Sequence, residues 1–514
     1  MKTLKNQHQE KISKAMKSVL NEQEAVNQNY WRLQYHVSTP AYWMNDPNGF
    51  CFYKGEYHLF YQHHPYSPEW GPMFWGHIKS RDLTHWEHLP IALAPSEEYD
   101  QDGCFSGSAV EKDGKLYAMY TGNVWTGANY DTDLRQVQCL AVSEDGVHFN
   151  KAAQNPVIDS VPEGNIHPDH FRDPKVWKKD DYYYCVLGSR TKDHEGQVLL
   201  YRSRDLMDWE FINIMAKSQG NLGFMWECPD LFSLGGQDVL VMSPQGVKPE
   251  GDLYHNLHQA GYVKGKLDYQ TGLLQHEDFQ LLDYGFDFYA PQTTEDEHGR
   301  RIMIAWMAMW ESCMPEQKYN WTGAMTIPRE LSIKQGNIIS KPIPELKQLR
   351  QHHVQYKNII VSGEQELAGI SGDCYELEVK INAKAASKFG VKLRTDNETH
   401  QETLLTYDRL ESLFIFNRNN SGEGDGGVRK APVGLNDNHL HLHLFVDKSS
   451  IEVFINEGEK VMTSRIYPVE NAKGICFFAD QEIELITLSK WNLSKGVSPL
   501  MFKGELDSLE EQAS

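Results

Sequence analysis

SRDLTHWE (residues 80–87) and SRDLMDWE (residues 203–210) are near-copies of one another, 123 residues apart. SEDGVHFN (residues 143–150) lies between them, with the same order of serine, acid, turn and aromatic residue. The spacings of 63 and 60 residues define a period of about 60 residues. A weaker fourth copy, LDYQTGLLQHEDF (residues 267–279), follows about one period later, so the chain repeats one structural unit.

Each repeat contains short runs with the composition of β-strands, such as GEYHLFYQ (55–62), GKLYAMYTG (114–122), DYYYCVLGS (181–189) and DVLVMSPQG (238–246). Repeated small sheets without helices between them are typical of a β-propeller. Residues 31–341 have room for about five blades at this period, so we expect a five-bladed β-propeller in an all-β protein. A single large β-sandwich is the competing architecture.

The pattern changes after the propeller segment. IPELKQLRQHH (343–353) is interpreted as a short linker helix, with the linker at residues 342–354. YELEVKI (375–381) and HLHLFV (441–446) then alternate apolar with polar residues, which is typical of an antiparallel β-sandwich with solvent-facing sides. The full division is an N-terminal helical extension (1–30), the propeller (31–341), the linker (342–354), the sandwich (355–495) and an acidic C-terminal tail (496–514).

The charge of the chain excludes some partners. Acidic residues outnumber basic ones by 71 to 50, and the two signs are interspersed, so we expect no binding to nucleic acid. No run of 18 apolar residues occurs, and the N-terminal segment lacks the apolar core of a signal peptide. We therefore expect a cytoplasmic protein with no membrane partner; a homo-oligomeric state is left open.

The eight cysteines contain no CxxC pair and mostly stand beside apolar or aromatic residues. We expect reduced, buried thiols rather than disulfides or zinc ligands.

Three carboxylic acids stand in unusual local sequences, WMNDPNG (43–49), HFRDPK (170–175) and WECPD (226–230). Asp46 lies 34 residues before the repeat at Ser80, Asp173 lies 30 residues before Ser203, and Glu227 lies 40 residues before Leu267. Because the innermost strands of a propeller surround one channel, residues at a comparable inner position gather at its mouth. The sequence thus predicts that the three acids converge, with Phe105 and Ser106 at the corresponding place in the second repeat.

Converging carboxylates suit the hydrolysis of glycosidic bonds, in which one acid protonates the leaving oxygen and another attacks the sugar or stabilises its cation. They also repel each other, so at least one should keep its proton at neutral pH. Structural roles compete with this interpretation: NDPNG is good turn chemistry, and Asp173 could pair with Arg172 or cap a turn. Glu227 stands among Trp226, Cys228 and Pro229, where an unpaired acid is costly, which favours a functional role.

With WMNDPNG, FSGSA (105–109), FRDP and WECPD in this order, the chain resembles glycoside hydrolase family 32, the invertase and fructan hydrolase family, over nearly its whole length. The resemblance implies a five-bladed propeller followed by a β-sandwich, no metal and no organic cofactor. It implies Asp46 as the nucleophile, Glu227 as the general acid/base and Asp173 as the residue that stabilises the transition state. Residues implied to bind the sugar are Trp43, Met44, Asn45, Gln62, Trp70, Trp75, Phe105, Ser106, Arg172 and Trp306.

The histidines of YQHHP (61–65) and HPDHF (167–171) do not change this interpretation. His167 and His170 are three residues apart, but no third ligand is evident in the sequence, and we expect no metal site.

The expected partner is a small sugar. The resemblance implies a retaining β-fructofuranosidase acting on sucrose 6-phosphate and sucrose. Two alternatives remain open: an enzyme of the same mechanism that hydrolyses short fructans, and a sugar-binding protein that uses the same fold without catalysis.

Overall fold

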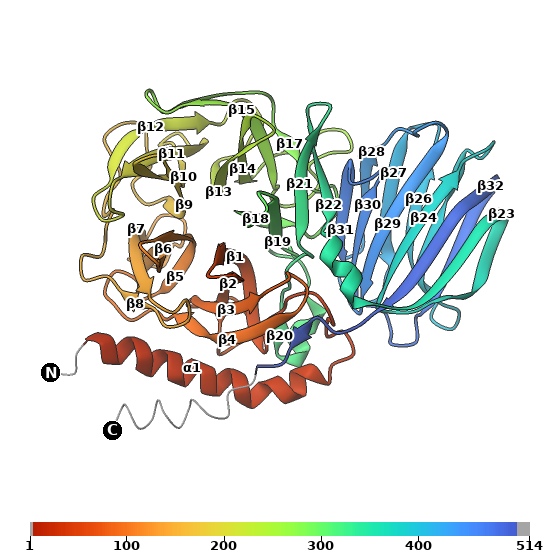
Figure 1. Ribbon diagram of the computed structural model, residues 1–514, viewed down its shortest axis with the longest axis horizontal. Coiled ribbons are helices and arrows are strands. Elements are labelled where there is room, and N and C mark those ends of the chain that lie inside the picture. The colour runs from red at the N-terminus through yellow and green to blue at the C-terminus, as the bar shows by residue number, and fades with distance from the viewer. Residues whose placement is uncertain (1–3, 501–514) are drawn as a thin grey trace.

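The computed structural model describes residues 4–500, and it is an all-β protein with few helices (Figure 1). Separate small sheets surround an axis in the N-terminal part, and a large sheet of 10 strands forms the C-terminal part. The predicted propeller-like arrangement followed by a β-sandwich is therefore confirmed, and the single large sandwich is excluded. The helices are α1 (Leu4–Asn27), η1 (Pro315–Tyr319) and η2 (Pro344–Leu349).

The N-terminal sheets each contain four principal strands that follow one another in the chain and pair antiparallel. Their innermost strands are buried along most of their length, which explains why the alternation typical of exposed strands is weak there. The strands of the first two sheets are β1 (Tyr42–Tyr53), β2 (Glu56–His64), β3 (Phe74–Ser80) and β4 (Trp86–Leu93), with β20 (Trp321–Thr322) and β33 (Val497–Ser498) at the edges of that sheet, and β5 (Gly103–Lys112), β6 (Lys115–Trp125), β7 (Leu134–Ser143) and β8 (Asn150–Lys151).

The other sheets of this part have the same order of pairing. Their strands are β9 (Phe171–Lys179), β10 (Tyr182–Arg190), β11 (Gly196–Ser203) and β12 (Glu210–Lys217); β13 (Met225–Leu234), β14 (Gln237–Gln245), β15 (Gly261–Asp268), β16 (Leu273–His276) and β17 (Gln280–Leu281); and β18 (Tyr289–Glu295), β19 (Arg301–Trp306), β21 (Arg329–Lys334) and β22 (Asn337–Pro342).

The repeated sequence turns out to be one recurring turn. Ser80, Ser143 and Ser203 each end the third strand of a sheet, and the aspartate two residues later accepts hydrogen bonds from backbone N–H groups of the turn. Asp205, for example, accepts from Met207 at 2.9 Å and Asp208 at 3.0 Å. An aspartate that satisfies its own backbone in this way fixes a turn without apolar packing, which is why the motif is so visible in the sequence.

Polar side chains close the ring of sheets on its axis. Asn48 accepts a hydrogen bond from Gly107 of the next sheet, and Ser108 accepts one from Val176 of the sheet after that. Lys175 donates to the carbonyl of Thr293 at 2.6 Å and pairs with Asp230 at 3.0 Å. Thr293 N–H donates to Asp230, Phe50 N–H donates to Gln292, and Gln292 donates to the carbonyl of Gly107 at 2.8 Å. We call Asn48, Ser108, Lys175, Asp230 and Gln292 the axial ring; each stands on an innermost strand.

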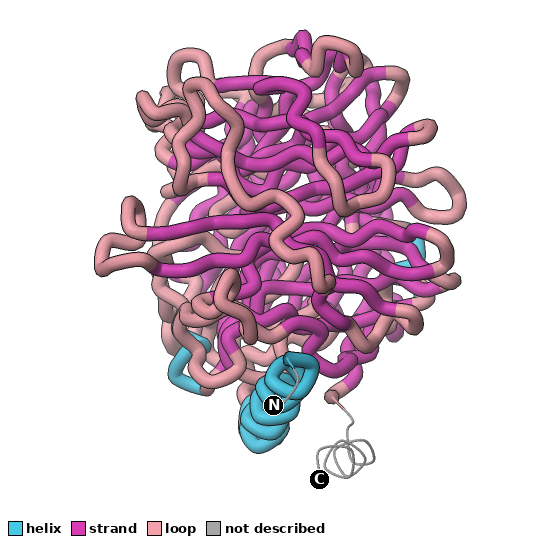
Figure 2. The backbone as a smooth tube through the Cα atoms, turned by 90° about the vertical axis from the view of Figure 1, so that its left-hand side faces the viewer, coloured by secondary structure: helices cyan, strands magenta, loops and turns pink. Residues whose placement is uncertain are grey.

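The predicted N-terminal helix exists as α1, which runs along the first sheet (Figures 1 and 2). Ile12, Met16 and Val19 are buried in a cluster with Ile91 and other apolar residues of the propeller. Most polar residues of α1 are exposed or half-exposed, but His8 is buried and accepts a hydrogen bond from Ala94 N–H, so the sequence shows only a weak apolar stripe.

In the C-terminal part, two long strands, β23 (Arg350–Ser371) and β32 (Gly474–Leu493), pair with each other. Residues 474–479 of β32 pair with β25 and residues 484–492 pair with β24, so this strand joins the two layers of the sandwich. The other strands are β24 (Tyr375–Asn382), β25 (Lys388–Asp396), β26 (Gln401–Asp408), β27 (Leu413–Asn420), β28 (Val428–Pro432), β29 (His439–Asp447), β30 (Ser450–Ile455) and β31 (Lys460–Arg465).

The predicted linker helix is only partly right. Residues 344–349 form the 3-10 helix η2, but β23 already begins at Arg350, inside the segment predicted as linker. At the other end, Leu500 bonds through its backbone to the side chain of Gln23 on α1, and the acidic residues 506–514 of the predicted tail lie outside the described residues.

A buried charged cluster joins the two parts. Arg329 of β21, with no exposed side-chain surface, donates to Asp283 at 3.0 Å and to Glu452 of β30 in the sandwich. Glu452 is also bound to His36, whose other ring nitrogen contacts Asp447 at 2.9 Å. The sandwich therefore packs on the propeller through fixed ionic contacts as well as apolar ones.

All eight cysteines are free, and all lie within the described part of the chain. Most are buried as predicted, but Cys313 is exposed. None of the helices in residues 4–500 is long and apolar enough to cross a membrane.

Candidate active site

The structure brings Asp46, Asp173 and Glu227 together from three different innermost strands, β1, β9 and β13. The Sγ atom of Cys228 lies 3.6 Å from Oδ2 of both aspartates. Arg172 bridges the other pair, since its Nη2 is 2.7 Å from Glu227 Oε1 and its Nε is 3.9 Å from Asp173 Oδ2. The three acids thus belong to one network of contacts.

A break in strand pairing shapes each of these positions. The pairing register shifts between Met44 and Pro47 in β1 and between Glu227 and Asp230 in β13. In β9 it shifts between Arg172 and Lys175, which pair with Gly188 and Val186 of β10. Asp173 and Cys228 have φ of 64° and 47°, values that few residues adopt without surrounding support. The prolines after Asp46, Asp173 and Cys228 help fix these bulges.

The register predicted for Glu227 is off by one residue. Asp46, Ser106 and Asp173 each stand two residues before an axial-ring residue of their strand. In β13 the residue at that position is Cys228. Glu227 instead corresponds to Arg172 in β9, one position earlier. The repeat spacing alone lacked the resolution to show this difference.

One oxygen of Asp46 is held and the other is free. Oδ2 accepts a hydrogen bond from Ser106 Oγ at 2.8 Å, whereas Oδ1 is buried without a hydrogen-bond partner among the described residues. Burial, with repulsion from Glu227, raises the pKa of Asp46 to about 6.

Glu227 is the most strongly held of the three acids. Oε1 accepts hydrogen bonds from Arg172 Nη2 at 2.7 Å and Nε at 3.1 Å, and Oε2 accepts from Tyr289 at 2.5 Å and Gln245 at 2.9 Å. Burial acts to raise the pKa of Glu227, but the charge of Arg172 and these hydrogen bonds outweigh it and lower the pKa. The pair with Arg172 keeps this acid ionised.

Asp173 is the acid that holds a proton most readily. Burial, opposed by the charge of Arg172 and reinforced by repulsion from Glu227, raises the pKa of Asp173 to about 7. The sequence-based expectation that one acid keeps its proton near neutrality therefore falls on the aspartates rather than on Glu227.

The predicted sugar-binding residues divide into two groups. Asn45 and Arg172 stand beside Asp46 and Asp173 on the same strands, Phe105 and Ser106 stand on the innermost strand β5 between them, and Trp70 is partly exposed at 36%. Trp43 donates its indole N–H to Asn45 at 2.7 Å, and Gln62 donates to the carbonyl of Cys104. The side chains with no exposed surface, which pack behind this site, are Met44, Trp75 and Trp306.

Sequence reasoning missed Tyr289, Gln245 and His170. Tyr289 precedes Ala290 and Pro291, where β18 also shifts its register and Ala290 has φ of 49°. FYAPQ (288–292) is therefore a further copy of the acid–proline motif in which the acid is missing, and aligning it with WECPD could have found the tyrosine.

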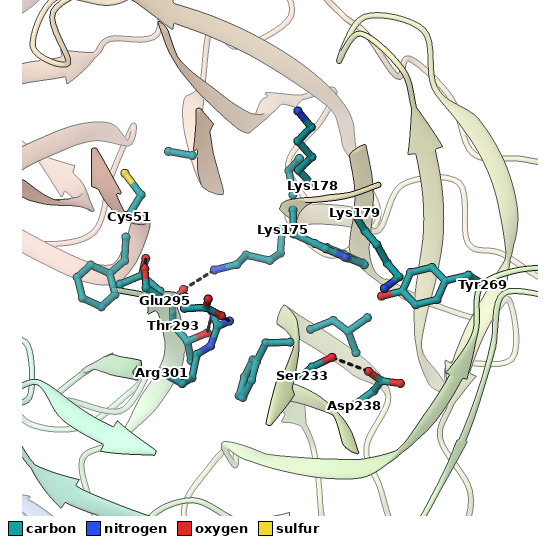
Figure 3. Close-up of a pocket in the computed structure, with 17 residues that line it drawn as sticks. Cys51, Lys175, Lys178, Lys179, Ser233, Asp238, Tyr269, Thr293, Glu295 and Arg301 are labelled. Carbon is teal, nitrogen blue, oxygen red and sulfur yellow. Dashed lines mark hydrogen bonds and ion pairs between the residues drawn. The ribbon is translucent and has the colours of Figure 1, made fainter. Parts of the chain in front are cut away.

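A separate cavity of about 380 Å³ lies at the other end of the axis (Figure 3). It is lined by Lys175, Thr293 and Arg301 and by residues that follow the acids along the innermost strands, such as Phe50 and Leu231. The axial ring stands between this cavity and the acids, so the cavity is not part of the candidate active site.

His167 and His170 pack edge to face, with ring centroids 5.1 Å apart. Within residues 4–500, no group of three or more His, Cys, Asp and Glu side chains is placed to hold a metal ion.

Comparison with known families gives two matches that together span most of the chain. Residues 36–342 match the glycosyl hydrolases family 32 N-terminal domain, and residues 345–492 match the glycosyl hydrolases family 32 C-terminal domain. Among curated relatives, a sucrose-6-phosphate hydrolase of Zymomonas mobilis is 42% identical over 480 residues, covering 90% of this chain and 92% of the relative. A sucrose-6-phosphate hydrolase of Bacillus subtilis is 37% identical over 501 residues, covering 96% and 99%.

Solved structures give the same result. A Bombyx mori family 32 β-fructofuranosidase mutant in complex with sucrose has a TM-score of 0.83 at 37% identity, covering 94% of this chain and 98% of that one. A sucrose-6-phosphate hydrolase from Lactobacillus gasseri has a TM-score of 0.83 at 29% identity, covering 93% and 96%. With these matches and the three acids in one network, the chain belongs to glycosyl hydrolases family 32 and is a glycoside hydrolase.

Proposed function

We propose that the chain is a retaining β-fructofuranosidase that hydrolyses sucrose 6-phosphate, and also sucrose, to fructose and glucose 6-phosphate or glucose. The observation that carries the proposal is the meeting of three acids from three innermost strands in one network, in which Cys228 contacts Asp46 and Asp173 and Arg172 pairs with Glu227. A retaining mechanism needs two carboxyl groups at one site, one as the nucleophile and one as the acid and base.

In the first step, Asp46 attacks the anomeric carbon of the fructosyl unit and the bond from that carbon to the bridging oxygen breaks. Glu227 gives its proton to that oxygen, so the glucose unit leaves as an alcohol. In the second step, the Glu227 carboxylate takes a proton from water, whose oxygen attacks the same carbon and releases Asp46. Asp173 accepts hydrogen bonds from fructosyl hydroxyls and stabilises the positive charge that develops on the ring.

Because Glu227 is ionised in the free site, the mechanism needs a step that gives it a proton. Glu227 must hold a proton before it can act as an acid, and Arg172 and Tyr289 oppose this. Sugar hydroxyls that engage Arg172 would weaken its pair with Glu227, and the loss of water around the bound sugar would favour the neutral acid. Substrate binding would then transfer a proton within the site to Glu227.

Relatives support the choice of substrate. Proteins named sucrose-6-phosphate hydrolase align with 90% or more of the chain, which favours the phosphorylated disaccharide, and the sucrose complex of the Bombyx mori enzyme favours sucrose as a second substrate. Purified protein should be assayed with sucrose 6-phosphate, sucrose and kestose in parallel. Highest kcat/KM on kestose would favour a fructan hydrolase, and binding without turnover of all three would favour the non-catalytic alternative.

The roles of the acids are tested by Asp46→Asn and Glu227→Gln. We expect Glu227→Gln to lower kcat on sucrose about 100- to 10,000-fold, and fructosyl fluoride to restore the first step, seen as a burst of released fluoride, because fluoride needs no proton to leave; the second step stays slow without the base. Asp46→Asn should be as inactive on the fluoride as on sucrose, because no glycosyl-enzyme can form. Equal rescue of the two variants would show that the roles are assigned wrongly.

We also propose that the sheets beginning with β1, β5, β9, β13 and β18 are five blades of one propeller at residues 31–341, and that the sandwich begins with β23 at Arg350 and ends near residue 495. The axial ring supports this count, since each of its links joins two of these sheets and the last returns from Gln292 to Phe50 of β1.

A further inference from the structure

A cluster of one arginine and two histidines lies beside the acids, at the end of β10 and just before β9. Arg190 is only 2% exposed, and its Nη1 donates to Asp131 Oδ1 at 3.1 Å. His170 Nε2 is 3.6 Å from the same oxygen and 2.7 Å from the carbonyl oxygen of Asp131. His167 is a further neighbour, with Nε2 3.5 Å from Arg190 Nη2. The carboxylate of Asp131 thus contacts both Arg190 and His170, and it is 60% exposed.

Arg190 has more donor capacity than Asp131 uses. Its Nε is buried without a hydrogen-bond partner among the described residues, and a guanidinium group offers five N–H donors in a fork that matches carboxylate or phosphate oxygens. The other acids nearby do not contact Arg190: Asp169 pairs with His167 at 3.9 Å, and Asp193 accepts a hydrogen bond from Asn165. A buried arginine with an unused donor is suited to an anion of more oxygens than Asp131 provides.

The cluster is coupled to the proposed acid/base. His170 Nδ1 is 3.0 Å from Arg172 Nη1, and Arg172 in turn donates twice to Glu227. Because Glu227 must meet the bridging oxygen of the substrate, the leaving sugar lies next to it, and the contacts through Arg172 and His170 place Asp131 and Arg190 on one side of that position.

The loop that carries Asp131 borders the same space. Residues 126–133 connect β6 with β7, and the loop is closed by hydrogen bonds between Thr126 and Asp133 and between Asn129 and Asp133. Tyr130 stacks on Trp125 with ring centroids 4.4 Å apart, and Trp125 contacts Phe105 and Trp70, which belong to the predicted sugar-binding set. The aromatic rings therefore form a wall that leads from the acids to Asp131.

We propose that Arg190 and His170 bind the phosphate group of the leaving sugar, and that Asp131 occupies this place until a phosphorylated substrate displaces it. This inference rests on the proposed function, because it names the contacts that would distinguish sucrose 6-phosphate from sucrose at the same site. A phosphate monoester carries more charge than one carboxylate and has three terminal oxygens, so it can use the donor of Arg190 that Asp131 leaves unpaired.

The test compares kcat/KM on sucrose 6-phosphate and sucrose for Arg190→Gln, with Arg202→Gln as the matched control, since Arg202 forms an exposed pair with Glu210 on outer strands. We expect Arg190→Gln to lower kcat/KM on sucrose 6-phosphate about 10- to 100-fold, and on sucrose by less than about threefold. Arg202→Gln should leave both values unchanged. Equal losses on both substrates, or an unchanged preference, would overturn the proposal in favour of a purely structural ion pair.

Asp131→Asn provides a second, independent measurement, because Asp131 is exposed and its replacement by an isosteric amide is compatible with folding. Removing the competing charge should tighten competitive inhibition by glucose 6-phosphate about three- to tenfold, while inhibition by glucose stays the same. Weaker or unchanged inhibition by glucose 6-phosphate would contradict the proposal.

A failure of the proposed function would look different. If the native protein hydrolyses neither disaccharide, calorimetric titration with glucose 6-phosphate still tests the cluster directly. Binding that Arg190→Gln abolishes and Arg202→Gln retains would support the phosphate site even then, and no binding to the native protein would refute it.

Discussion

The buried carboxyl group of Asp46 lowers the stability of the native state at neutral pH. Asp46 in the native state has a pKa raised to about 6 by burial and by repulsion from Glu227, while an aspartate in an unfolded chain titrates near 4. A raised native pKa means that the native state binds the proton more tightly, so native stability falls as pH rises from about 4 to about 6.

Asp46→Asn should therefore stabilise the protein at pH 7. The pKa shift corresponds to a gain in unfolding free energy on the order of 3 kcal/mol. The gain should vanish below about pH 4, where the carboxyl group of Asp46 is protonated in both the folded and the unfolded state. Thermal unfolding of the variant and the native protein at pH 4 and pH 7 measures this difference. A variant that is less stable at pH 7 would mean that the ionised Asp46 is better satisfied than its free Oδ1 suggests.

Tyr289→Phe tests how Glu227 is kept ionised. Removing the hydroxyl deletes the 2.5 Å hydrogen bond to Oε2, so the pKa of Glu227 should rise and the alkaline limb of the kcat/KM profile should move to higher pH. Tyr201→Phe is a suitable control, since its hydroxyl lies buried on β11 without a hydrogen-bond partner in the described residues. Identical pH profiles for native protein and Tyr289→Phe would exclude this role for the tyrosine.

The sequence was sufficient to predict that the three acids converge and insufficient to predict their protonation. Local motifs mark these acids because Asp46 and Asp173 stand directly before a proline and Glu227 stands two residues before one. The distribution of protons depends on Tyr289, 62 residues from Glu227, and on Arg172, 55 residues away. Such contacts arise only when the innermost strands come together, and no pattern within one motif encodes them.

At the scale of elements, the recurring Ser–x–Asp turn should act as an independent stabilising unit in each sheet. Asp205→Ala removes the acceptor of two backbone N–H groups, and we expect a loss of about 1 to 2 kcal/mol in stability with kcat unchanged. Asp205→Asn should retain most of the stability because its amide oxygen can still accept. Equal destabilisation by the two substitutions, measured by thermal unfolding, would show that the charge and not the acceptor matters.

The same turns explain which elements could be predicted. The repeats in the sequence reveal the sheets whose third strand ends in this turn. In the last sheet of this part, the third and fourth strands, β21 and β22, are joined through Gln335 and Gly336, both with positive φ, and this turn gives no such motif. The start of β23 was taken for helix because this strand pairs only with β32 and exposes most of its side chains. Without a buried face, it has no apolar alternation to reveal it.

At the scale of the whole molecule, Arg329 holds the sandwich to the propeller. Arg329→Met would leave Asp283 and Glu452 buried without their cation, which should destabilise the protein by about 3 to 5 kcal/mol. Arg202→Met breaks a partly exposed pair and should change stability by less than about 1 kcal/mol. Thermal unfolding of both variants provides the comparison, and similar midpoints for the two would contradict a special role for the buried cluster.

The axial ring determines from which side substrate and water enter the site and products leave it. Lys175, Thr293 and Asp230 fill the axis behind the acids, so every molecule that reaches Asp46 arrives and departs through one entrance. In the proposed double displacement, the glucose unit must vacate this entrance before water can reach the fructosyl ester, and fructose must therefore depart last. Any alcohol that enters during this interval competes with water for the same carbon, so concentrated sugar should divert the reaction from hydrolysis to the synthesis of longer fructosides.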